Sequence, residues 1–117
     1  MNTNGPTVGE HFENRDAAVK KTYNAILGRA RKLGPVKEDP KKTSIHLVRK
    51  TAFAGIATRK TGLVLTLKSD SDVANKRIAR REQASANRWH LEIKLDSPEQ
   101  VDKEIEAWLR KAYELAG

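Results

Sequence analysis

The sequence contains no cysteine among its 117 residues. A disulfide framework and a thiolate metal site are therefore excluded, as is redox chemistry carried by the protein's own thiols. No apolar run approaches the ~20 residues that a membrane-spanning helix needs, and the N-terminal stretch lacks the basic start and apolar segment of a signal peptide. We therefore expect a soluble, cytoplasmic protein that has no membrane partner.

Aromatic residues are also scarce, at 5% of the chain. Proteins that bind single-stranded nucleic acid stack bases on exposed aromatic rings, whereas the spacing of Trp89 and Trp108 predicts that both belong to the core. Any contact with nucleic acid is then expected to be made mostly to phosphates and to be independent of base sequence.

Metal and catalytic motifs are missing as well. The three histidines, His11, His46 and His90, include no pair three or four residues apart, which is the spacing that puts two metal ligands on one helix face. No glycine-rich phosphate loop, Gly-x-Ser-x-Gly elbow or Ser/His/Asp set is visible. We therefore expect no metal and no cofactor, and the sequence favours a binding protein over an enzyme.

What the chain has in excess is positive charge, with 23 Lys and Arg against 15 Asp and Glu and a net charge of +8. Residues 36–95 hold 14 basic and 6 acidic side chains, whereas residues 96–117 hold 3 basic and 6 acidic ones. A molecule polarised in this way would approach a polyanion with its basic part first. A basic surface that serves only to keep the protein in solution is the alternative interpretation.

Helical patterns occur near both ends of the chain. Residues 1–6 are expected to form a disordered tail, and the next four residues have the spacing of a capping box that would begin a short turn. Apolar residues recur at helical spacing over 16–33, before Gly34 and Pro35 end that helix. The segment 97–100 supplies an N-cap serine, a first-turn proline and a second capping box, so a C-terminal helix is predicted to start there.

Between the helices the pattern is that of β-strands. Residues 40–67 are predicted to form three successive strands joined by basic turns, and residues 88–95 alternate apolar and polar side chains most cleanly. A short edge strand at 36–39 and a strand at 77–84 are also expected. Small residues make the middle strand, 52–57, slim, so another backbone, a helix or a flat ligand could approach it closely, and we favour close helix packing as the reason. Gly62 in the following turn is free to adopt a positive φ.

These elements predict an α+β fold with an N-terminal helix, an antiparallel meander of about five strands and a C-terminal helix. Both helices are expected to pack on one face of the sheet, leaving the other face polar. Residues 7–117 would then form a single domain.

The basic cluster gives the first functional hypothesis. A binding module of this kind would engage a polyanion, such as nucleic acid, through basic residues along one edge of the sheet. The side chains that we expect to make these contacts are Lys41, Lys42, Arg59, Lys60, Arg77, Arg80 and Arg81.

A second hypothesis is a module that binds a small ligand or a partner protein on the polar face of the sheet. His46 and His90 each fall out of phase with the apolar residues of their strands, so both are predicted to point to that face, although two ordinary surface histidines would give the same pattern. The residues that we expect near such a pocket are Thr43, Ser44, His46, Phe53 and His90.

A third hypothesis is a metal-dependent nuclease. Glu92 and Lys94 lie two apart on a predicted strand, and together with an upstream aspartate, Asp70 or Asp72, they match the residue types that such enzymes use to hold a divalent ion and a water. The alternation of the strand, however, places Glu92 on a solvated face rather than in a cleft.

The motif Pro-Lys-Lys-Thr-Ser-Ile-His-Leu at 40–47, with the segments 51–55 and 63–67, Arg59-Lys60 and the Ser97-Pro98 helix start, resembles a bacterial domain of unknown function. Some of its members carry the label predicted transport protein, and others are appended to nuclease-like or restriction-like modules. The resemblance runs from about Val8 onward. It implies a strand at 77–84, favours a role associated with nucleic acid, and implies no catalytic residue.

Overall fold

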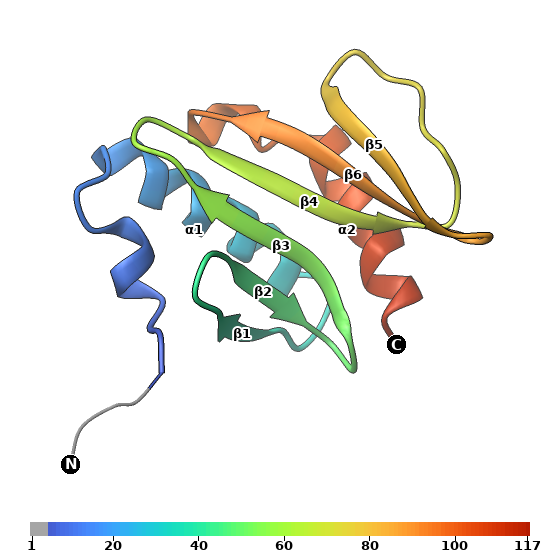
Figure 1. The fold of residues 1–117 in the computed structure, drawn as a ribbon, viewed down its shortest axis with the longest axis horizontal. Helices are drawn as coiled ribbons and strands as arrows, with labels where there is room; N and C mark the ends of the chain where they lie inside the picture. The colour runs from blue at the N-terminus through green and yellow to red at the C-terminus, as the bar shows by residue number, and fades with distance from the viewer. Residues whose placement is uncertain (1–4) are drawn as a thin grey trace.

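The computed structural model describes residues 5–117 (Figure 1), so the first four residues of the tail expected at 1–6 lie outside the described residues. Along the chain, six strands lie between two α-helices. The fold is α+β, as the sequence predicted. The elements are η1 Gly9–Phe12, α1 Ala17–Arg31, β1 Lys37–Pro40, β2 Ile45–Val48, β3 Ala52–Thr58, β4 Leu63–Ser69, β5 Ile78–Ser85, β6 Arg88–Leu95, η2 Pro98–Gln100 and α2 Lys103–Leu115.

The six strands form one antiparallel sheet in the order β1-β2-β3-β4-β6-β5. The sequence predicted about five strands in a meander; the structure has one more, and β6 rather than β5 pairs with β4. The apolar side chains of β6 explain this order. Leu91, Ile93 and Leu95 are all buried, which suits a strand that lies between two others rather than at the edge of the sheet. Strand β5 is exposed along almost all of its length and lies at the edge.

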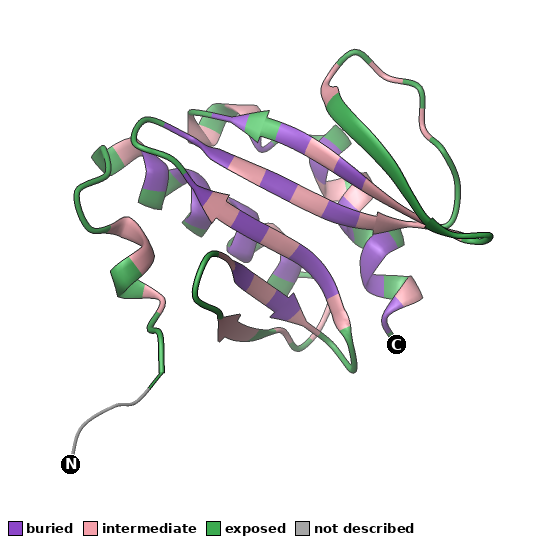
Figure 2. Ribbon diagram, viewed as in Figure 1, coloured by how far each residue is buried: buried purple, intermediate pink, exposed green. Residues whose placement is uncertain are grey.

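Both helices lie on one face of the sheet, behind it in Figure 1, and the core fills the space between these two layers. Buried and half-buried residues therefore alternate along β3, β4 and β6, as the stripes in Figure 2 show. We call the face opposite the helices the open face. It carries the side chains that alternate with the buried ones along the strands. Within residues 5–117, no helix has the length and apolar content that a membrane crossing requires.

The N-terminal turn η1 confirms the predicted capping box. The backbone N–H of Thr7 donates to Glu10 Oε1 at 2.7 Å, and the N–H of Glu10 donates to Thr7 Oγ1 at 3.3 Å. Phe12 then packs against Tyr23 of α1, with 5.2 Å between the ring centroids. The turn thereby covers one end of the core beside β3.

The C-terminal helix begins later than the sequence predicted. The capping box at Ser97 is present, but it caps only the 3-10 turn η2, and the chain leaves helical geometry at Val101, which is buried. The helix α2 starts after Asp102, whose Oδ1 accepts a hydrogen bond from the N–H of Ile105 at 3.2 Å. The prediction failed because Val101 turns into the core between the two segments.

Two glycines have other roles than the sequence suggested, and their contacts show why. Gly55 lies on the open face beside His46, so the slim middle strand is not explained there by helix packing. Gly62 does not have a positive φ; instead, a Cβ at this position would come within 2.8 Å of the carbonyl oxygen of Leu95. Close packing of the turn against the end of β6 therefore requires this glycine.

The aromatic residues divide differently from the prediction. Trp89 and Trp108 are only half-buried, whereas Phe53 and Tyr113 are 1% and 6% exposed and meet edge to face with 5.3 Å between centroids. A bulge explains the inward position of Phe53, because Leu47 pairs with Ala54 and Val48 with Ala52. The extra residue between these pairs, Phe53, turns into the core.

Candidate functional site

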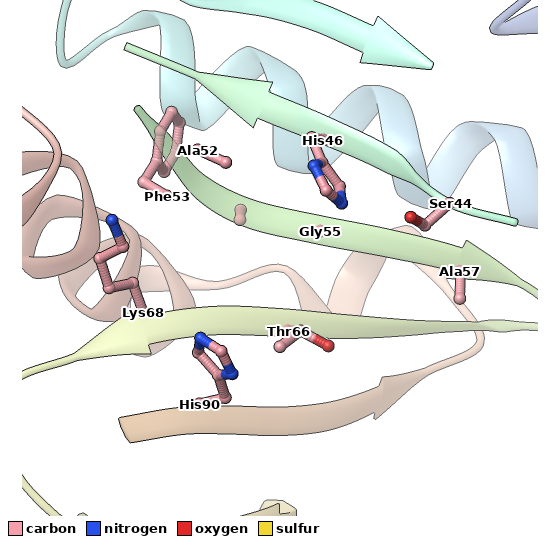
Figure 3. Close-up of a pocket in the computed structure, with 10 residues that line it drawn as sticks. Ser44, His46, Ala52, Phe53, Gly55, Ala57, Thr66, Lys68 and His90 are labelled. Carbon is pink, nitrogen blue, oxygen red and sulfur yellow. The ribbon is translucent and has the colours of Figure 1, made fainter. Parts of the chain in front are cut away.

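A groove of about 270 Å³ runs over the open face, across β2, β3, β4 and β6. We call it the open-face groove. Its floor is formed by small residues of β3, namely Ala52, Gly55 and Ala57, and polar side chains of the neighbouring strands border it (Figure 3). Those polar residues are Ser44, His46, Thr66, Lys68 and His90.

The missing side chain of Gly55 shapes this groove. Gly55 pairs with His46 on β2 and with Thr66 on β4, so the three residues form one row across the open face. A Cβ added to Gly55 would lie 3.7 Å from Cδ2 of His46, which shows that the imidazole leans over the glycine. The glycine therefore keeps the floor between β2 and β4 low.

Three side chains that carry or can carry positive charge border the groove. His46 lies on the β2 side, while Lys68 and His90 pair with each other on β4 and β6 (Figure 3). The ammonium of Lys68 donates to Thr51 Oγ1 at 3.3 Å, and it forms no salt bridge with any acid of residues 5–117. Its charge is therefore available to a ligand.

The carboxylates that face the two histidines across the outer strand pairs do not line the groove. Asp39 of β1 pairs with His46, and Glu82 of β5 pairs with His90. Both acids are engaged by cations, with 3.0 Å from Lys41 Nζ to Asp39 and 3.2 Å from Arg80 to Glu82. The groove itself has no acidic residue in its lining.

The groove brings together four of the five residues that the sequence proposed for a ligand pocket, Ser44, His46, Phe53 and His90. The side chain of Phe53 packs against Tyr113 in the core, and the exposed Thr43 in the β1–β2 turn does not line the groove. Thr66 and Lys68 were missed. The alternation of β4, in which Leu63, Leu65 and Leu67 are buried, would have placed both on the polar face.

The basic residues of the polyanion hypothesis do not lie together. Lys41, Lys42, Arg59 and Lys60 belong to the β1–β2 and β3–β4 turns, which lie at the same end of the sheet because Ile45 pairs with Ile56. We call this end the turn end. Arg80 and Arg81 lie on β5, the opposite edge strand. There Arg80 forms a salt bridge with Glu82, and the guanidinium of Arg81 lies 3.3 Å from Asp72.

Arg77 has a structural role that makes it a poor phosphate ligand. Its guanidinium lies 3.0 Å from Asp102 and 2.9 Å from Glu104, and it also donates to the carbonyl of Gln100 at 2.7 Å. The hydrogen bond to Glu104 is the main effect that raises the pKa of Arg77 above its usual value. Arg77 thus fixes the chain before β5 to the start of α2.

The acids of the nuclease hypothesis do not converge. Glu92 pairs with Thr66, in the middle of β4, whereas Asp70 and Asp72 follow the end of that strand, beyond the pair of Ser69 with Trp89. Within residues 5–117, no group of three or more His, Asp or Glu side chains is placed to hold a metal ion.

A known family model matches residues 8–116 of the chain. The matching family is described as Domain of unknown function (DUF5655). The chain belongs to this family. No curated protein and no solved structure matches the chain. Membership in the family agrees with the resemblance of the 40–47 motif, and it assigns no role to the open-face groove.

Proposed function

We propose that the protein is a binding module whose open-face groove takes a small anionic ligand with an apolar body. One observation supports this proposal more than any other. His46, Lys68 and His90, from three different strands, border a concave surface that has a floor of Ala and Gly and no acidic residue in its lining.

The chemistry of the lining selects the ligand. A carboxylate or phosphate group accepts charge-assisted hydrogen bonds from the ammonium of Lys68 and from imidazole N–H groups, while the floor of β3 is apolar and suits a flat hydrocarbon or ring system. Hydroxyl groups of Ser44 and Thr66 add neutral hydrogen bonds.

Titration calorimetry and thermal shift with a panel of aromatic and aliphatic carboxylates and phosphates test the proposal. Binding raises the melting temperature because the ligand binds the folded state alone. Lys68→Ala is expected to weaken binding about tenfold or more, since a hydrogen bond to a charged group contributes roughly 1.5–3 kcal/mol.

Gly55→Val provides a second test, because it fills the floor of the groove while valine favours a strand. We expect binding to be lost without loss of stability. Lys20→Ala, on the exposed face of α1, removes the same charge elsewhere and is expected to change nothing. The proposal is wrong if no anion of the panel binds, or if Lys68→Ala and Gly55→Val bind as the unmodified protein does.

A second candidate function is contact with a polyanion such as nucleic acid at the turn end. Lys42, Arg59 and Lys60 project from two turns at this end, and none forms a salt bridge with an acid of residues 5–117. Affinity for duplex DNA should then fall steeply with salt. A complete absence of binding at low ionic strength would refute this function.

A further inference from the structure

A second cavity, of about 440 Å³, lies at the turn end of the open face and shares no lining residue with the open-face groove. We call it the end cleft. The β3–β4 turn, the first residues of β4, the last residues of β6 and the turn η2 enclose it. The residues that matter for its chemistry are Arg59, Val64, Glu92, Lys94, Asp96 and Gln100.

Charges of both signs line the end cleft. Glu92 pairs with Thr66 and Lys94 with Val64, so both side chains project from the open face of β6, about 7 Å apart along the strand. Asp96 follows the strand, and Arg59 extends from the facing turn. None of these four charged residues forms a salt bridge within residues 5–117.

Hydrogen bonds hold the walls of the end cleft in place. The N–H of Arg59 donates to the carbonyl of Gly62 at 2.7 Å, and the N–H of Asp16 donates to the carbonyl of Lys60 at 2.9 Å, which ties this turn to the start of α1. On the other side, Gln100 Oε1 accepts from the N–H groups of Asp96 and Ser97 at 2.6 and 3.1 Å. A preformed cavity loses little entropy when a ligand binds.

We infer that the end cleft binds a zwitterionic amino compound, such as a free α-amino acid, through the cations Arg59 and Lys94 and the carboxylates Glu92 and Asp96. The ligand's carboxylate pairs with the two cations and its ammonium with the two carboxylates. A plain anion would meet Glu92 and Asp96, and a plain amine would meet Arg59 and Lys94, so repulsion disfavours each. Val64 offers apolar contact to the ligand's side chain.

Calorimetry or NMR titration with L-leucine, N-acetyl-L-leucine and L-leucinamide tests this inference. The second compound lacks the ammonium and the third lacks the carboxylate. We expect leucine to bind and each derivative to bind at least tenfold more weakly. The variants Glu92→Gln and Lys94→Gln keep the side-chain size and should each weaken leucine binding at least tenfold. Lys68→Ala, in the open-face groove, should leave it unchanged.

Three results would overturn the inference. The first is that leucine does not bind at millimolar concentration. The second is that the N-acetyl derivative binds as tightly as leucine, which would mark a plain anion site. The third is that binding is lost in Lys68→Ala and kept in Glu92→Gln, which would place leucine in the open-face groove. Failure here is separate from failure of the proposed function, because the anion panel reports on Lys68 and Gly55 and not on Glu92.

Discussion

Single glycines show how much a sequence pattern leaves open at the residue scale. Gly55 keeps the floor of the open-face groove low beside His46, Gly62 lets the turn reach the carbonyl of Leu95, and Gly34 combines a φ of 152° with close contact to Tyr113. The sequence marks each position as unusual. The sequence alone does not reveal the contacts responsible. Leu95 and Tyr113 are distant in the chain from Gly62 and Gly34, and His46 lies on a neighbouring strand.

Gly34 provides a prediction at this scale. A Cβ at position 34 would collide with the hydroxyl of Tyr113, which donates to the carbonyl of Pro35 at 2.9 Å, and the φ of 152° is unfavourable for any other residue. Gly34→Ala is expected to lower the free energy of unfolding by about 1–3 kcal/mol, measured by urea denaturation.

Gly28 is the matched control for that substitution. It lies within α1, and a Cβ there meets nothing within 4 Å, so Gly28→Ala should stabilise the protein by about 0.5–1 kcal/mol through helix propensity. Equal effects of the two substitutions would contradict the explanation given for Gly34.

At the scale of elements, apolar periodicity predicted most of the fold. The alternation in β6 and the helical spacing in α1 and α2 are strong signals because each element buries one face. Strand order is harder to predict, since β5 and β6 form a hairpin that can present either strand to β4. The buried leucines of β6 decide the order, and the polar sequence of β5 agrees with an edge position.

The start of α2 gives a prediction that depends on pH. Removal of the N-cap by Asp102→Ala is expected to cost about 1 kcal/mol of stability at pH 7. Desolvation raises the pKa of the Asp102 carboxyl, but hydrogen bonds from Ile105 and Arg77 and the charge of Arg77 outweigh it, so the pKa is lowered overall. The ionised form is therefore favoured in the folded state.

This stabilisation is fully present above the ordinary pKa of an aspartate, ~3.9, and is lost as the pH falls through the lower pKa of the folded state. The difference in urea midpoint between the unmodified protein and Asp102→Ala should shrink below about pH 4. Asp102→Asn keeps a capping oxygen and should lose less stability at pH 7. A difference that is the same at pH 3 and pH 7 would show that the carboxylate charge has no role.

At the scale of the whole molecule, the sequence shows the excess of positive charge and its position along the chain. It did not predict how these charges are distributed over the surface of the folded protein. Seven basic residues were expected along one edge, yet the sheet order places Arg80 and Arg81 at the edge opposite Lys41 and Lys42, and Arg77 binds Asp102 and Glu104 at the start of α2. The open-face groove was predicted in part, because strand alternation alone places His46 and His90 on the polar face.

Polyanion binding can be tested by comparing two triple variants that have the same net charge. One replaces Lys42, Arg59 and Lys60 at the turn end with alanine, and the other replaces the exposed Lys32, Lys50 and Lys111. If the turn end contacts phosphates, the first variant should reduce the slope of log K against log salt for duplex DNA by about 3, at ~0.9 per lost contact. The second should leave the slope unchanged, because these three lysines lie away from the turn end, after the end of α1, in the β2–β3 turn and on α2 near the end of β4. Equal losses in both variants would mean that net charge attracts DNA to the molecule as a whole, with no defined contact surface at the turn end.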